Sequence, residues 1–116
     1  MPGSSPYGLF GFNQSSTELY VEWSSIPRDK VNGILLGYKI FYTRNSSRSE
    51  NGSYPVWNVK EVRAQIDATA LGGLDKFTWY IIHVAAFNSK GVGPKSAPIV
   101  LRTSEDGNDA LVFFVM

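Results

Sequence analysis

The stretch of this sequence most suggestive of chemistry is Gly91-Val92-Gly93-Pro94-Lys95-Ser96. Glycines with a following lysine are typical of a phosphate-binding loop, whose pattern is G-x-x-x-x-G-K-[ST] before a helix. Here Gly93 is followed by Pro94, and the next residues predict a strand, so no helix N-terminus is available to receive an anion. We therefore predict a hairpin turn, with positive φ at Gly91 and Gly93 and with Pro94 at the start of a strand.

His83 is the only histidine, and the sequence has no cysteine. A catalytic triad or a zinc site requires partner groups that this composition does not supply, and the lack of cysteine excludes disulfides and thiol catalysis. The carboxylates Glu61, Asp67, Asp75 and Glu105 are scattered, and no spacing pairs two of them. We therefore predict no enzyme, no cofactor and no metal site. His83 is expected on the outer face of a sheet, as an ordinary surface residue or as part of a pH-sensitive contact.

The length and charge of the chain narrow the class of protein further. It has 116 residues, 43% of them hydrophobic and 14% aromatic, which suits one globular domain with a core built from large rings. A formal net charge of +1 does not favour nucleic acid or an anionic membrane as a partner. We assign residues 6–105 to the domain and residues 1–5 to a linker or cloning remnant. Three interpretations of the tail, residues 106–116, stay open: the start of a transmembrane segment, an extra strand or an expression remnant.

The elements that must position these residues are strands, because apolar side chains alternate with period two and turn residues separate the runs. The runs lie at 19–23, 34–44, 56–62, 65–71, 79–87 and 99–103, and Asn32-Gly33 marks a turn. Short strands in this number predict an all-β sandwich or barrel without helices. Alternation assigns a shared core to Trp23, Tyr38, Ile40, Tyr80, Ile82, Val84, Ala86, Ile99 and Leu101.

Several motifs, taken in their order, resemble the fibronectin type III family. They are Trp23, then GYKIFY at 37–42, then Leu74 with Tyr80 six residues later, then VAAFNSKGVGPKS at 84–96, and finally Thr103. The resemblance covers residues 6–105 and implies a seven-stranded, two-sheet immunoglobulin-like sandwich. It also implies a tyrosine corner, in which the Tyr80 ring is buried and its hydroxyl bonds to loop backbone. The departures from the family pattern are Lys76, in place of a proline, and Gly8 and Gly11 in the first strand.

The same resemblance implies a function. A fibronectin type III module of a larger cell-surface or extracellular protein would act as a spacer and protein-interaction unit in cell adhesion or receptor signalling. Its parent would be membrane-anchored, its partners would be neighbouring domains or a protein ligand, including a homophilic one, and the isolated module would be a monomer. The alternative is an intracellular structural repeat of a muscle or cytoskeletal protein, which would use the same fold as a mechanical spacer.

One face of the predicted sandwich is more apolar than a water-facing sheet should be. Alternation places five residues outward on this side, which together we call the contact face: Phe41, Trp57, Ile81, His83 and Phe87. Such a patch marks protein contacts. The alternative is that long side chains such as Lys39 and Arg102, together with a neighbouring domain, cover it. The loops that contain Arg28 and Lys90 are further candidate contact sites.

Three N-x-[ST] triplets begin at Asn13, Asn45 and Asn51. Two of them fall in one polar loop, between the predicted strands at 34–44 and 56–62. Exposure there would permit glycans if the protein passes through a secretory pathway. We therefore regard these asparagines as candidate N-glycosylation sites. The alternative is a polar loop that uses Asn and Ser only for turning.

Overall fold

The computed structural model describes residues 2–26, 31–45 and 56–105, and every regular element within them is a strand. The strands are β1 (Tyr7–Asn13), β2 (Leu19–Ser24), β3 (Gly37–Arg44), β4 (Asn58–Arg63), β5 (Ala68–Leu71), β6 (Trp79–Asn88), β7 (Gly91–Val92) and β8 (Ile99–Arg102). No helix of the described residues is long and apolar enough to cross a membrane. The predicted all-β class is confirmed.

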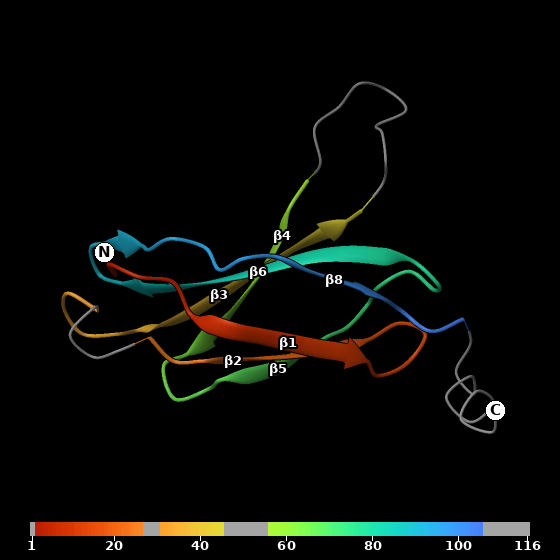
Figure 1. Ribbon diagram of the computed structural model, residues 1–116, viewed down its shortest axis with the longest axis horizontal. Coiled ribbons are helices and arrows are strands. Elements are labelled where there is room, and N and C mark those ends of the chain that lie inside the picture. Colours follow the sequence, from red (N-terminus) through yellow and green to blue (C-terminus); the bar gives the residue numbers. More distant parts are fainter. Residues whose placement is uncertain (1, 27–30, 46–55, 106–116) are drawn as a thin grey trace.

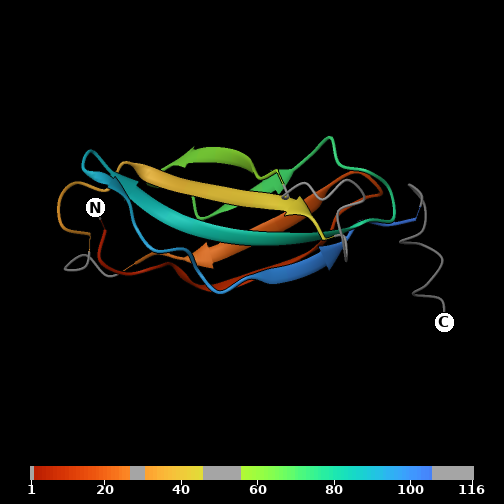
Figure 2. The ribbon, with the colours of Figure 1, turned by 90° about the horizontal axis from the view of Figure 1, so that it is seen from above.

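Two antiparallel sheets pack face to face. The first has the order β1-β2-β5, and the second has the order β4-β3-β6-β7, with β8 also paired to β6. Figures 1 and 2 show that β1 runs beside β8 at one side of the sandwich. At the β4–β5 side, Lys60 of β4 donates a hydrogen bond from Nζ to the Ala70 carbonyl of β5 at 2.7 Å. The predicted two-sheet sandwich is therefore confirmed.

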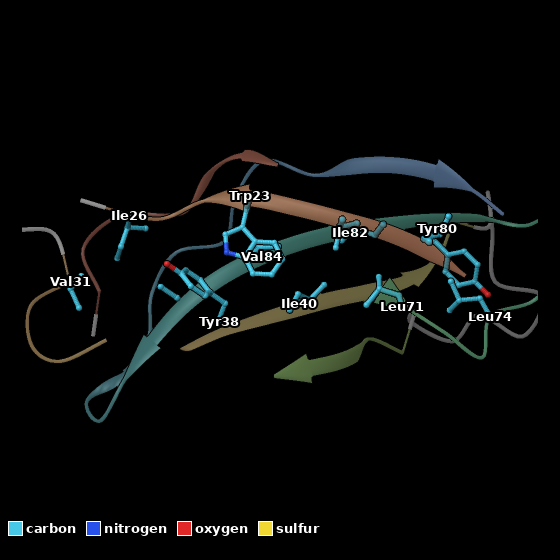
Figure 3. Close-up of a cluster of buried hydrophobic side chains, with 13 residues drawn as sticks. Trp23, Ile26, Val31, Tyr38, Ile40, Leu71, Leu74, Tyr80, Ile82 and Val84 are labelled. Atoms are coloured by element: carbon cyan, nitrogen blue, oxygen red, sulfur yellow. The ribbon is translucent and has the colours of Figure 1, made fainter. Parts of the chain in front are cut away.

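The core lies between the sheets because every second side chain of β2, β3 and β6 points inward (Figure 3). Trp23 of β2 is 4% exposed, and its ring meets the fully buried Tyr38 ring edge-on, with centroids 5.4 Å apart. Ile99 and Leu101, also predicted for the core, are partly buried and pack against it. The other buried members are Leu19, Val21, Ile26, Val31, Ile40, Leu71, Leu74, Tyr80, Ile82, Val84 and Ala86.

The turn that leads into β6 is fixed by a buried hydrogen-bond network. The Tyr80 hydroxyl accepts a hydrogen bond from the Asp75 N–H at 2.9 Å, which forms the predicted tyrosine corner. Thr103, fully buried, donates from Oγ1 to the Asp75 carbonyl at 2.7 Å and accepts from the Thr78 N–H at 2.9 Å. Between them, Phe77 adopts a φ of +50°, an uncommon conformation for an aromatic residue. The network joins this turn to the residue that directly follows β8.

The described residues form eight strands rather than seven, because Gly91–Val92, which were predicted to lie in a hairpin turn, form the short strand β7. β7 and β8 both pair with β6, and residues 93–98 separate them. The expectation of positive φ holds for Gly91, at 142°, but is wrong for Gly93. Gly93 instead packs against Pro2, whose Cβ would lie 2.9 Å from a Cβ at this position. Pro94 does not start a strand, because β8 begins at Ile99.

Most strand boundaries differ from the predicted ones by one to three residues. The strand predicted at 34–44 begins at Gly37, since the chain is still leaving a turn in which Asn32 and Gly33 both have positive φ. Ile34 therefore lies outside the sheet and is 81% exposed. The strand predicted at 65–71 begins at Ala68, because Ile66 belongs to a turn and donates its N–H to the Arg63 carbonyl. An apolar residue type next to a turn misled the prediction in both places.

The two unexpected glycines of the first strand have separate physical explanations. Gly8 has a φ of +65° and lies where the β1–β2 register shifts, between Tyr7 and Phe10. A bulge of this kind favours glycine because it is strained for other residues. Gly11 faces the interior, where a Cβ would overlap the Tyr20 carbonyl oxygen and lie 2.8 Å from the Leu101 side chain. Gly8 thus permits the bulge in β1, and Gly11 permits β1 to lie close to β2 and to the Leu101 side chain.

Candidate functional site

The contact face lies on the outer side of the β4-β3-β6 sheet, as the strand registers require. Phe41 of β3 is directly opposite His83 of β6, and Ile81 and Phe87 follow on the same side of β6. Trp57 lies just before β4, with its ring 5.5 Å from the His83 ring. All five side chains are half-buried. The structure therefore brings the five predicted residues onto one side of the sheet.

Long cationic side chains lie over the rings of this face. The Lys95 ammonium is 4.4 Å from the Phe41 ring centroid and 5.4 Å from that of Trp57. The Lys39 ammonium is 5.3 Å from the Phe87 centroid. An ammonium at this distance is attracted by the ring quadrupole. The surface is therefore cationic as well as aromatic, whereas the prediction was of an apolar patch with aromatics.

A third cation lies at the end of the same sheet. Arg102 of β8 is directly opposite Trp79 of β6. Its guanidinium carbon lies 4.2 Å from the Phe77 centroid and 5.2 Å from the Trp79 centroid. Both rings are about half exposed, at 50% and 47%. These contacts agree with the expectation that the Lys39 and Arg102 side chains cover part of this side of the sheet. Lys95 also covers rings on this side, which was not predicted.

His83 has a defined structural role on this face. Its Nδ1 lies 2.8 Å from the Ser96 carbonyl oxygen. Because a carbonyl oxygen only accepts, Nδ1 carries the hydrogen in this bond. Ser96 also accepts from the Val84 N–H through its Oγ at 3.0 Å. His83 and Ser96 thus hold the segment between β7 and β8 onto β6, where the strand pairing is interrupted.

The other two candidate contact sites are the loops that contain Arg28 and Lys90, and the structure describes only the second of them completely. Arg28 lies outside the described residues, and a hollow of about 560 Å³ opens beside that loop. The hollow is lined by Ser25, Ile26, Val31, Gly33, Ile34 and Leu35. The loop that contains Lys90 is a tight turn between β6 and β7, in which the Lys90 N–H donates to the Asn88 side chain at 2.9 Å. Ser89 and Lys90 of this turn are exposed.

The acidic residues and the glycosylation candidates lie in several separate parts of the fold. Within the part of the chain that the structure describes, no three His, Asp or Glu residues gather as metal ligands. Asp75 forms an ion pair with Arg44 at 3.3 Å. Asn13 and Asn45 are exposed, at the end of β1 and just after β3. Asn51 lies outside the described residues.

A second exposed aromatic cluster, which was not predicted, lies on the outer side of the β1-β2-β5 sheet. Phe10 and Phe12 of β1 are 55% and 48% exposed, and their ring centroids are 6.3 Å apart. Phe12 also lies 5.1 Å from Tyr20 of β2. Phe10 is directly opposite Glu22. The alternation of Phe10 and Phe12 was the available signal, and the two glycines of β1 obscured it.

Comparisons with known proteins agree with this architecture. Residues 4–102 match the family model described as fibronectin type III domain. The chain is 36% identical over 92 residues to the mouse neural cell adhesion molecule L1-like protein, covering 78% of this chain and 8% of that protein. It is 37% identical over 105 residues to protein sidekick of Drosophila melanogaster, covering 89% of this chain and 5% of that protein.

A solved structure gives the same result. The third fibronectin III domain of the human KIAA0343 protein superposes with a TM-score of 0.85 at 29% identity, covering 92% of this chain and 86% of that domain. The chain therefore matches most of a single-domain structure but spans less than a tenth of the two relatives named above. From its motifs, its two-sheet sandwich and these matches, the chain belongs to the fibronectin type III family.

Proposed function

We propose that this chain is a non-catalytic module of a larger, membrane-anchored cell-surface protein, and that it lies outside the cell. It spaces neighbouring domains and contacts a protein partner through the contact face during cell adhesion. The observation that carries the proposal is the gathering of Phe41, Trp57 and His83 on the outer side of one sheet, where polar residues are the rule. Similarity to the neural cell adhesion molecule L1-like protein supports the adhesion role.

Partner binding is expected to depend on Ile81, the third residue of β6. The Ile81→Lys variant places a charge at the edge of the aromatic cluster and removes apolar contact area. We expect binding of the fluorescently labelled chain to the surface of cultured neural cells, measured by flow cytometry, to fall at least about tenfold. The free energy of unfolding should change by no more than about 1 kcal/mol, because a lysine at this half-buried position can extend into water.

Ile66→Lys is the matched control, since Ile66 is 41% exposed in the turn before β5 and lies apart from the contact face. It should leave cell binding and the melting temperature unchanged. If the Ile81→Lys variant bound cells as well as the wild-type chain does, the partner would not bind through the contact face.

Glycosylation is proposed at Asn45 and Asn13, because both side chains are exposed. Asn45 donates its backbone N–H to the Trp79 carbonyl, so a glycan on Asn45 would lie near the first residue of β6. Expression in a secreting eukaryotic cell should give a chain whose intact mass falls on treatment with peptide-N-glycosidase. The Asn45→Gln variant should lack one glycan. A secreted chain with the unmodified mass of 12.8 kDa would contradict the proposal.

A further inference from the structure

The two outer faces of the sandwich carry different chemistry. On the contact-face side, the outward positions of the β-sheet and the adjoining segment carry four cations and one acid: Lys39, Arg63, Lys95, Arg102 and Glu61. Lys39 forms an ion pair with Glu61 at 3.9 Å. Within the described residues, neither Lys95 nor Arg102 has a carboxylate within ion-pair distance. Lys95 and Arg102 are therefore cations that are held over rings and, among the described residues, lack a counter-charge.

The opposite side presents exposed rings and an acid. We call it the aromatic face: Tyr7, Phe10, Phe12, Tyr20 and Glu22. The registers Phe10↔Glu22 and Phe12↔Tyr20 place these side chains on the side of β1 and β2 away from the core. Tyr7 is 62% exposed, and no Lys or Arg stands within β1, β2 or β5. In the part of the chain that the structure describes, Glu22 has no cation within ion-pair distance.

The chemistry of the two faces is complementary. A ring face attracts an ammonium or a guanidinium, and a carboxylate attracts both more strongly. Phe10, Phe12 and Glu22 supply rings and a carboxylate, and Lys95 and Arg102 supply the cations. The counter-charges missing from each face are therefore present on the opposite face of another copy.

We propose that the partner of the contact face is a second copy of this chain, which binds through its aromatic face. This inference rests on the proposed function and names the occupant of the same surface. Because the two faces lie on opposite sides of the sandwich, the contact is heterologous, and a pair of copies keeps one free contact face and one free aromatic face. The result is an open stack of modules, favoured where copies are concentrated, as they are on a cell surface. It differs from the monomer that the sequence alone favoured.

Charge-reversed variants test the pairing directly. Lys95→Glu/Arg102→Glu makes both faces acidic, and Phe12→Lys/Glu22→Lys makes both faces basic. Phe12, Glu22, Lys95 and Arg102 are exposed, so both variants should keep the fold, which circular dichroism and melting temperature check. Sedimentation velocity of the full chain from about 10 to about 500 μM, in low and high salt, measures association.

The wild-type chain should sediment faster as its concentration rises, and salt should suppress this effect. Each variant alone should associate at least about tenfold more weakly, because like charges then face each other. An equimolar mixture of the two variants should regain association, since acidic faces meet basic ones. A 12.8 kDa monomer for the wild-type chain at every concentration would overturn the inference. So would association of either variant alone at the wild-type level, or a mixture that stays monomeric.

These outcomes separate the inference from the proposed function. A monomeric wild-type chain whose binding to neural cells still requires Ile81 would overturn self-association and leave the contact face with a different protein partner. If the Ile81→Lys variant loses both self-association and binding to neural cells, and the mixture of charge-reversed variants associates, the results support both the inference and the proposed function.

Discussion

Replacement of Trp23 by alanine is expected to lower the free energy of unfolding by about 3–5 kcal/mol, as truncation of a buried aromatic typically does. Trp23 is 4% exposed and packs edge-on against Tyr38 between the two sheets. Its Nε1 makes no hydrogen bond to a described residue, so its contribution comes from packing and from burial of the ring. A domain of this size is typically stable by about 5–15 kcal/mol, and the loss is therefore a large part of the total.

Urea unfolding followed by tyrosine fluorescence and circular dichroism measures this loss. Trp23→Phe, which keeps a ring in the core, should fall between the wild-type chain and Trp23→Ala. Trp79→Ala is the matched control, because it removes the same side chain from a position that is 47% exposed. It should cost no more than about 1 kcal/mol, the scale of its stacking on Arg102. Equal losses for the two alanine variants would show that the core is not centred on Trp23.

The architecture was predictable because alternation of side chains depends only on the pleat of a strand. Trp23, Tyr38 and Ile82 each lie at an inward position of a strand, and each is buried. The strand ends were less predictable, since apolar type says nothing about where a turn begins. Ile34 and Ile66 have strand-forming side chains but follow or belong to turns. Backbone hydrogen bonds across the sheet decide these ends, and they join residues far apart in sequence.

The candidate site was predictable in its position but not in its character. Parity along β6 is enough to place Ile81, His83 and Phe87 on one side. The cation over Phe41 was not predictable. Lys95 lies in the segment 93–98, between the two strands that pair with β6, and this segment has no strand pattern that would give the direction of its side chains. The hydrogen bond from His83 to Ser96 depends on the same segment. Irregular segments place side chains by tertiary contact, which local pattern does not encode.

Gly37→Ala is expected to destabilise the domain by about 1–3 kcal/mol, the range typical of overpacking. Gly37 has an ordinary strand conformation, which alanine can also adopt. If backbone conformation were the only effect, alanine would stabilise the domain by about 0.4–1 kcal/mol, because it lowers the conformational entropy of the unfolded chain. A Cβ at this position would, however, overlap the Val62 carbonyl oxygen of β4 and lie 3.0 Å from the Phe87 ring. The neighbour is backbone, which cannot rotate away as a side chain can. Relief would require β4 to shift, and the pairing of Tyr38 with Val62 would shift with it.

Gly72→Ala is the matched control for this close approach. Gly72 also lacks positive φ, and the nearest atoms to a Cβ there are in the Glu18 side chain, at 3.9 Å. Its free energy of unfolding, measured in urea, should stay the same or rise by about 0.4–1 kcal/mol, since only the unfolded-state effect operates. Two glycines that both lack positive φ should thus respond to the same substitution with opposite signs. If Gly37→Ala matched Gly72→Ala, β4 would have to yield freely. The glycine of the GYKIFY motif would then need an explanation other than the distance between β3 and β4.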